Sequence, residues 1–145
     1  MNDQRMKPRQ DVEWVIADTL ARGRRPGYFQ GHSVPKAAVD TWLGTVRAFG
    51  IKSIICLLGD DQLLYYKDLG TDLLSYYRGA GFDVEHVPAP DHQTPPLSAD
   101  HLAAIWTAYG ELPKPLLVHC SAGIDRTGRA VEDIQNRLRQ KAARD

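Results

Sequence analysis

Cysteines and long apolar stretches are scarce in this sequence, and both absences narrow what the protein can be. The two cysteines, Cys56 and Cys120, are too few for a disulfide-stabilised scaffold or for a cysteine-rich zinc site. No apolar stretch approaches the roughly 18 residues that cross a bilayer, and residues 1–14 lack the apolar segment of a secretory signal. We therefore expect a cytoplasmic protein whose thiols stay reduced and available for chemistry.

An excess of charge of either sign is also missing. The 18 Lys and Arg residues balance 18 Asp and Glu residues, so no overall charge attracts nucleic acid or an anionic membrane surface, and neither is an expected partner. At 145 residues, the chain is long enough to bury a core, and we expect one domain over residues 1–145. Residues 1–11 are polar and are expected to be flexible. No pattern in the sequence indicates an oligomeric state.

The periodicity of apolar residues predicts alternating strands and helices. Helices are expected from Ser33 and Pro35 to Gly50, as two short segments within 59–81, from Ser98, and from near Arg126. Strands are expected at 13–17, 27–31, 51–58, 82–88 and 116–120. The basic stretch 21–27 reads as a solvated turn, or else Arg22, Arg24 and Arg25 steer an anionic substrate. This order predicts the α/β class, with a central, mostly parallel sheet flanked by helices.

The stretch VHCSAGIDRTGR, residues 118–129, has the pattern of an anion site. A buried strand leads into a tight loop and then into the first turn of a helix, where backbone N–H groups and the helix dipole favour negative charge. Gly123 permits a backbone conformation that other residues resist. Arg126 supplies a planar fork suited to two oxygens of a phosphate. Cys120 lies at the base of this predicted site.

A thiol in such a place is expected to be a thiolate at neutral pH, because the helix N-terminus and nearby cations favour its charged form. We expect Cys120 to be a nucleophile rather than a buried structural cysteine. The hydroxyl of Thr127 is placed to hydrogen-bond the sulfur and help it leave. His119 is expected to hold the loop by hydrogen bonding and to tune the thiol, without acting as the base.

The segment HCSAGIDRTG resembles the signature of the protein tyrosine phosphatase superfamily, in which His-Cys is followed by five residues, Arg, and Ser or Thr. His119, Cys120, Arg126 and Thr127 match it. The stretches WVIADTLARGRRPG and GIKSIICLL resemble compact dual-specificity members, and the resemblance covers most of residues 13–130. It implies the cysteine phosphatase fold and a phosphate bound by the loop residues Ser121, Ala122, Gly123, Ile124, Asp125 and Arg126.

The superfamily also uses an aspartate on a mobile loop as general acid, and the matching stretch here is VPAPDHQTPPL, with Asp91 as the matching residue. Asp83 and Asp100 are the competing candidates. The resemblance implies attack by Cys120 on phosphorus, protonation of the leaving oxygen by Asp91, and hydrolysis of a phosphocysteine by water that Asp91 activates. This mechanism needs no metal and no cofactor. The expected substrate is a phosphorylated protein, as a phosphotyrosine with or without phosphoserine and phosphothreonine.

Several alternatives stay open at the level of sequence. Phosphatases of phosphoinositides, inositol phosphates or RNA 5′ ends share parts of the signature. Some lipid phosphatases carry Asp-Arg at the positions of Asp125 and Arg126. They usually also have a basic residue within the loop, and this sequence lacks one. We expect Asp125 to point away from the phosphate and to bond to neighbouring backbone or to a basic side chain. A phosphate-binding module without turnover is the alternative outside enzymes.

Two further features have alternative interpretations. Cys56 is expected to be a core residue, or else the partner of Cys120 in a reversible disulfide. The polar end at Asp145 fits either a minimal domain or one that lacks C-terminal helices of the compact members.

Overall fold

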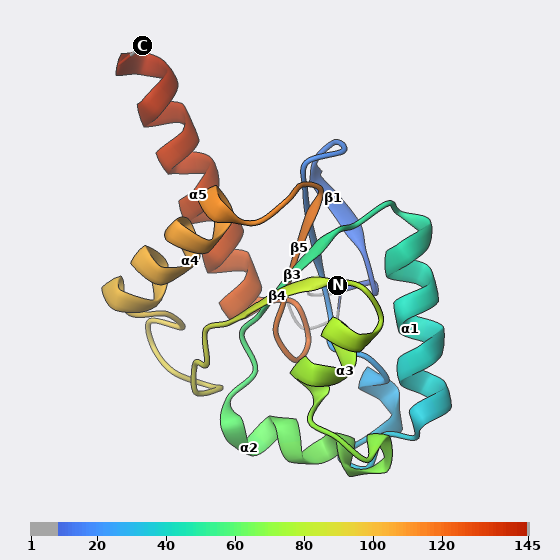
Figure 1. Ribbon diagram of the computed structural model, residues 1–145. Coiled ribbons are helices and arrows are strands. Elements are labelled where there is room, and N and C mark those ends of the chain that lie inside the picture. Colours follow the sequence, from blue (N-terminus) through green and yellow to red (C-terminus); the bar gives the residue numbers. More distant parts are fainter. Residues whose placement is uncertain (1–8, 145) are drawn as a thin grey trace, which may run out of the picture.

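The computed structural model describes residues 9–144, which form a five-stranded sheet flanked by helices (Figure 1). The strands are β1 (Glu13–Ile16), β2 (Leu20–Gly23), β3 (Ser53–Cys56), β4 (Asp83–His86) and β5 (Leu116–His119), in the order β1-β2-β5-β3-β4. Strands β2, β5, β3 and β4 are parallel, and only the edge strand β1 runs antiparallel to its neighbour. The prediction of an α/β fold with a mostly parallel central sheet is confirmed.

Helices cover both faces of this sheet (Figure 1). The helices α1 (Lys36–Ala48) and α3 (Leu73–Gly79) pack on one face, and α4 (Ala99–Glu111) and α5 (Asp125–Arg144) pack on the other. The short helices α2 (Asp60–Leu63) and η3 (Leu64–Leu69) connect β3 to α3. Because side chains alternate along a strand, one run of apolar residues supplies both cores: Ile54 belongs to the α1 and α3 side and Ile55 to the other.

Local signals set the helix boundaries. Ser98 caps α4 by accepting a hydrogen bond from the His101 amide at 3.1 Å, and the His101 side chain accepts one in return from the Ser98 amide. Gly50 follows α1 with a φ of 78°, a left-handed conformation that glycine adopts without strain. These boundaries agree with the helices predicted from Ser33 and Pro35 to Gly50 and from Ser98.

The segment between β1 and α1 differs from the prediction. Residues 20–23, assigned in part to a basic turn, form β2, which pairs with both β1 and β5. Residues 28–30, expected within a strand, form the 3-10 helix η2 (Tyr28–Gln30) between two glycines of positive φ. The sequence favoured the wrong elements because β2 takes its apolar environment from neighbouring strands, while its own residues include arginine and glycine.

Helix α5 is the longest element and runs from the loop after β5 past the edge of the sheet, so that its last turns project from the body of the molecule (Figure 1). Its buried residues all lie in its first half, ending at Ile134. Within residues 9–144, no helix combines the length and the apolar character needed to cross a membrane.

Of the stretch 1–11 expected to be flexible, residues 1–8 lie outside the described residues. Residues 9 and 10 contact other parts of the chain: the Arg9 amide donates to the Ala122 carbonyl, and the Gln10 carbonyl accepts from the Arg24 amide.

Candidate active site

The carboxyl ends of the four parallel strands bring together two predicted site residues, Asp91 and Cys120, and two that the sequence did not indicate, Arg25 and Gln62. Arg25 follows β2, Gln62 lies just beyond β3, Asp91 lies in the loop after β4, and Cys120 follows β5 directly. These residues line one cavity of about 440 Å³. Ligands of open α/β sheets bind at this end of the strands, so the topology itself places a site here.

The loop 120–126 is held from outside by its carbonyl groups. The Ser121 carbonyl accepts a hydrogen bond from the Arg25 amide at 2.8 Å, and the Ala122 carbonyl accepts one from the Arg9 amide at 2.9 Å. The Gly123 carbonyl accepts one from Arg22 Nη2 at 2.7 Å. Three successive peptide groups therefore have their oxygens fixed by the segment before β1, by β2 itself and by the residues just after it.

This anchoring directs the amides of the loop to the opposite side. In a trans peptide the N–H points away from the C=O, so the amides of Ala122, Gly123 and Ile124 are turned from the anchoring segments. None of the three donates to an acceptor among the hydrogen bonds of residues 9–144. Gly123 has a φ of 75°, and a Cβ there would lie 2.5 Å from the Gly23 carbonyl oxygen, so only glycine fits. The result is a cradle of free donors at the start of α5.

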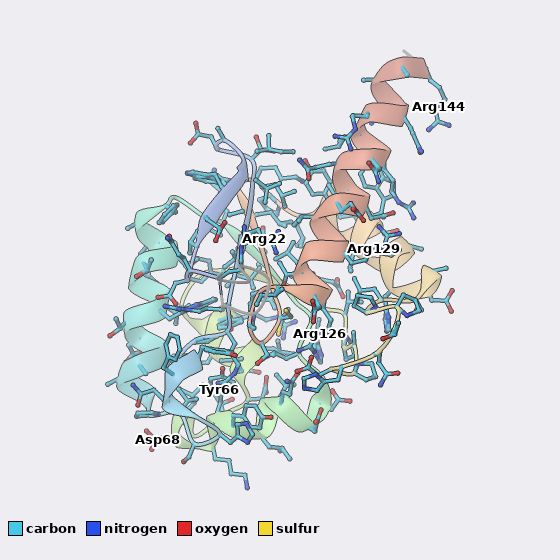
Figure 2. The ribbon with its side chains drawn as sticks, turned by 180° about the vertical axis from the view of Figure 1, so that it is seen from behind. Arg22, Tyr66, Asp68, Arg126, Arg129 and Arg144 are labelled. Carbon is cyan, nitrogen blue, oxygen red and sulfur yellow. The ribbon has the colours of Figure 1, made fainter. Side chains whose placement is uncertain are left out.

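Arg126 lies at the inner end of α5, with its side chain directed into the molecule (Figure 2). Its guanidinium is 2% exposed, and Nη1 donates to the carbonyls of Leu57 and Ala89 and to Oε1 of Gln62 at 2.8–3.2 Å. Nη2 has no hydrogen-bond partner among the described residues. One edge of the fork is thus fixed, and the other faces the cavity, where an oxyanion would have to displace its ion pair with Asp91.

Asp91 lies beside Arg126 at the rim of the cavity. Its Oδ2 is 3.3 Å from Arg126 Nη2 and accepts a hydrogen bond from Gln62 Nε2 at 3.2 Å. Its side chain is about one-third exposed, which leaves it accessible to a ligand and to water. The competing candidates lie elsewhere: Asp83 begins β4 at the other end of the sheet, and Asp100 lies in the first turn of α4.

His119 is buried on the α1 and α3 side of the sheet, behind the loop. Nδ1 lies 3.0 Å from the Cys120 carbonyl and Nε2 lies 2.9 Å from the Tyr77 hydroxyl. Burial lowers the pKa of His119 to about 4. Since a carbonyl can only accept, Nδ1 carries the proton of the neutral ring, and Nε2 accepts from Tyr77. His119 therefore holds the loop backbone through the Cys120 carbonyl, as expected, and is not itself among the residues that line the cavity.

Two predicted contacts of the loop are not formed. The Thr127 hydroxyl is buried and has no hydrogen-bond partner among the described residues, so its expected bond to the Cys120 sulfur stays a prediction. Asp125 is exposed at the start of α5, lines the cavity, and makes no side-chain hydrogen bond or ion pair within residues 9–144. The expectation that Asp125 points away from the site and bonds to backbone or to a basic side chain is therefore not supported. The helix N-terminus by itself accommodates its charge.

The place of Arg25 was not expected, because the basic stretch 21–27 was read as a solvated turn or, at most, as arginines that steer an anionic substrate from the surface. Its side chain is 3% exposed and donates from Nε to the Ser121 hydroxyl and from the other nitrogens to Tyr66, Tyr28 and Gly31. Arg22 instead contacts the loop from outside, and Arg24 pairs with Asp11 at 2.9 Å. Adjacent arginines thus have different roles, which their sequence alone does not separate.

Gln62 is the second missed residue. It is 4% exposed, and it contacts both Arg126 and Asp91. Nothing in the sequence around it, GDDQLL, distinguishes it from a polar residue on a short surface helix.

The two cysteines lie on opposite faces of the sheet. Cys56 is aligned with His119 in the pairing of β3 with β5, and it packs in the core beneath α1 and α3. Cys120 belongs to the core on the other side and lines the cavity. Both are free thiols, and a disulfide between them would require one strand end to turn over. The structure favours the core interpretation of Cys56.

Residues 31–135, most of the chain, match the Tc-R-P family, which is described as polymorphic toxin system, DSP-PTPase phosphatase. The chain belongs to this family. The resemblance to compact dual-specificity phosphatases is thereby confirmed for this DSP-PTPase. Among curated proteins, none matches the chain.

Solved structures share the fold of this chain at low identity. Tk-PTP, in a mutant form, is 22% identical with a TM-score of 0.58, over 82% of this chain and 66% of that one. A DUF442 protein from Shewanella putrefaciens CN-32, described as a phosphatase, is 18% identical with a TM-score of 0.63, over 97% and 78%. The catalytic domain of the PP-IP phosphatase SIW14 from S. cerevisiae is 19% identical with a TM-score of 0.57, over 89% and 67%. The chain thus spans about two-thirds of the length of Tk-PTP and SIW14.

Proposed function

We propose that this protein is a cysteine-dependent phosphomonoester hydrolase that acts on phosphotyrosine, with or without phosphoserine and phosphothreonine, through a phosphocysteine intermediate. The observation that carries the proposal is the convergence of Cys120, Nη2 of Arg126 and Asp91 on one cavity, beside three loop amides that have no acceptor among residues 9–144. A dianionic phosphoryl group supplies the acceptors that these donors lack.

In the first step, the Cys120 thiolate attacks phosphorus, and the bond between phosphorus and the leaving oxygen breaks. Asp91 in its acid form gives its proton to that oxygen, so the product leaves as an alcohol or a phenol. The loop amides and Arg126 Nη2 bind the three equatorial oxygens throughout. The phosphoryl group is then bonded to sulfur, and Asp91 is a carboxylate.

In the second step, water replaces the departed alcohol at the rim of the cavity. The Asp91 carboxylate takes a proton from this water as its oxygen bonds to phosphorus, and the bond between sulfur and phosphorus breaks. Inorganic phosphate is released, and the thiolate and the acid form of Asp91 are restored. The exposure of Asp91 supports both roles, since the same oxygen must reach the leaving group and then the water.

The lining of the cavity supports a phosphotyrosine better than a polyphosphate. Among the described residues of the lining, the arginine and lysine side chains are those of Arg25 and Arg126 alone, and the nitrogens of Arg25 already donate to protein acceptors. The carboxylates of Asp91 and Asp125 would repel further phosphates. The Tyr65 ring, stacked on the ring of His32 at 4.1 Å between centroids, offers an aromatic wall.

The test is hydrolysis of 4-nitrophenyl phosphate in the presence of EDTA and a reductant, by the wild type, Cys120→Ser and Asp91→Ala. We expect turnover that survives EDTA, that is lost in Cys120→Ser, and that falls severalfold or more in Asp91→Ala. Turnover that survives in Cys120→Ser would contradict the mechanism. A wild type that binds vanadate without hydrolysing the ester would indicate a phosphate-binding module.

The substrate class needs a second assay, in which a phosphotyrosine peptide is compared with phosphoserine peptides, inositol polyphosphates, phosphoinositides and RNA 5′ ends. We expect the highest kcat/KM on the phosphotyrosine peptide. A higher kcat/KM on an inositol polyphosphate would reject the tyrosine assignment and leave the two chemical steps intact.

A further inference from the structure

Gln62 joins the two groups that the proposed reaction uses on either side of the phosphate. It lies on α2, after β3, and its side chain is almost fully buried. Nε2 donates to Asp91 Oδ2 at 3.2 Å, while Oε1 accepts from Arg126 Nη1 at 2.9 Å and from the Gly59 amide at 3.2 Å. Because two donors face Oε1, the orientation of the amide is determined by its partners.

The side chain of Asp91 has few other contacts. Oδ1 accepts from the amide of the next residue, His92, and Oδ2 lies 3.7 Å from the almost fully exposed ring of His92. The remaining contact is with Arg126 Nη2, at 3.3 Å. Nη2 is the edge of the fork that a phosphoryl group would bind, so this contact competes with substrate. Among the described residues, the Gln62 amide is then the one buried partner of Asp91 that the phosphoryl group does not also need.

A neutral amide suits this position better than a charged group. Phosphate at Arg126 carries negative charge close to the Asp91 carboxylate and repels it. Gln62 can retain Asp91 by hydrogen bonding without adding a positive charge that would hold the carboxylate in its ionised form. At its other end, Gln62 fixes Nη1 of Arg126 and so leaves Nη2 directed at the cavity.

We propose that Gln62 is a positioning residue that holds Asp91 at the leaving-group side of the site while Arg126 binds phosphate. This inference rests on the proposed function, because it assigns Gln62 a part in proton transfer to the leaving oxygen. Gln62 acts through Asp91 and Arg126 and does not touch the reacting atoms.

The test compares two aryl phosphates that differ in their need for an acid. Phenyl phosphate has a basic leaving group that must be protonated, whereas 2,4-dinitrophenyl phosphate has a leaving group that departs without a proton. We expect Gln62→Met to lower kcat/KM for phenyl phosphate by about tenfold or more, and for the dinitrophenyl ester by less than about threefold. Equal losses on both esters would overturn the proposal, since they would show damage to the phosphate cradle or to the fold.

Gln62→Glu separates the two ends of the side chain. Glutamate keeps an oxygen for Arg126 and Gly59 but places a second oxygen where Nε2 faces Asp91, so it loses the donor and adds repulsion. We expect the same selective loss on phenyl phosphate as in Gln62→Met. A Gln62→Glu variant with the wild-type ratio of kcat/KM on the two esters would contradict the proposal. Gln140→Met, at an exposed position of α5, is the matched control and should leave both values unchanged.

Combining Gln62→Met with Asp91→Asn shows whether Gln62 acts through Asp91. In the double variant Asp91→Asn, Gln62→Met, we expect kcat/KM on phenyl phosphate to equal that of Asp91→Asn alone, within about twofold. A further tenfold loss would assign Gln62 an independent role and reject the proposal.

Hydrogen exchange gives a readout that does not require turnover. With tungstate bound in place of phosphate, amides of residues 88–97 should exchange faster in Gln62→Met and Gln62→Glu than in the wild type, while those of α4 should not change. Unchanged exchange in 88–97 would overturn the role of Gln62. Absence of hydrolysis by the wild type would instead reject the proposed function, so the two failures are distinguishable.

Discussion

Cys56 and Cys120 stand at the ends of neighbouring parallel strands, yet their surroundings have little in common. Cys56 is aligned with His119, so Cys120 lies one residue further along and faces the other side of the sheet. Cys56 is fully enclosed by the core beneath α1 and α3, and this burial raises the pKa of its thiol to about 12. Cys120 borders a cavity at the N-terminus of a 20-residue helix, beside Arg126.

The comparison shows that a single residue of register separates an inert thiol from a candidate nucleophile. On one face, apolar neighbours disfavour the charged form of sulfur. On the other, the loop amides, the start of α5 and a buried guanidinium surround a cavity that suits a bound anion. This contrast predicts differences in reactivity between Cys120 and Cys56 that can be measured.

The largest expected difference is in covalent catalysis. When turnover of an aryl phosphate labelled in its phosphoryl group is quenched with acid, the wild type and Cys56→Ala should retain labelled phosphocysteine. Cys120→Ser should retain no label. Turnover should fall at least about 10³-fold in Cys120→Ser and stay within about threefold in Cys56→Ala, which should cost roughly 1–2 kcal/mol of stability for the lost core volume. Label retained on Cys120→Ser would contradict the assignment of Cys120, rather than Cys56, as the nucleophile.

Alkylation should separate the cysteines without substrate. At pH 7, iodoacetamide should modify Cys120 at least about 10³ times faster than Cys56, because a buried thiol whose pKa is about 12 is almost wholly protonated and inaccessible. Peptide mapping of the alkylated protein over time measures both rates. Inorganic phosphate should protect Cys120 and leave the slow reaction of Cys56 unaffected. Comparable rates would contradict the structural contrast.

Replacing Arg126 by lysine tests whether charge alone makes the difference. Lysine keeps the positive charge but cannot span the Leu57 and Ala89 carbonyls with one nitrogen and present another to phosphate. We expect kcat/KM for an aryl phosphate to fall about 10²–10³-fold. Arg129→Lys, in the next turn of α5 and about one-third exposed, is the control and should stay near wild type (Figure 2). A near-normal Arg126→Lys variant would show that a point charge suffices.

The smallest effect concerns His119, which stands opposite Cys56 and bonds the Cys120 carbonyl. Burial lowers its pKa to about 4, so below pH 6.5 the unfolded chain binds a proton that the folded protein does not. Stability therefore falls as the pH falls from about 6.5 to 4. Between pH 7 and 4.5 the wild type should lose about 2 kcal/mol more than His119→Asn. Urea unfolding at both pH values measures this difference. Equal losses of stability in the wild type and in His119→Asn would contradict the lowered pKa of His119.

The sequence made the loop predictable because its chemistry is contiguous. From His119 to Thr127, the residues that would hold phosphate lie within nine positions, and the strand, turn and helix that arrange them are signalled locally by apolar residues, a glycine and the helix start. Asp91 was found by its proline-rich surroundings and by family resemblance, and the structure places it at the same cavity.

The contacts that complete the site were not predictable in this way. Arg25 meets Ser121 across 96 positions, Gln62 meets Arg126 across 64, and Arg22 meets Gly123 across 101. None of these residues differs locally from a polar residue on a turn or a surface helix.

The sequence by itself therefore determined the class of fold and pointed to the loop 120–126 and its candidate nucleophile, because these depend on short-range patterns. Tertiary structure decided which arginine is buried, which side of the loop presents its amides, and which glutamine reaches the candidate acid. Those outcomes depend on strand order and register, which bring together side chains that lie far apart along the chain.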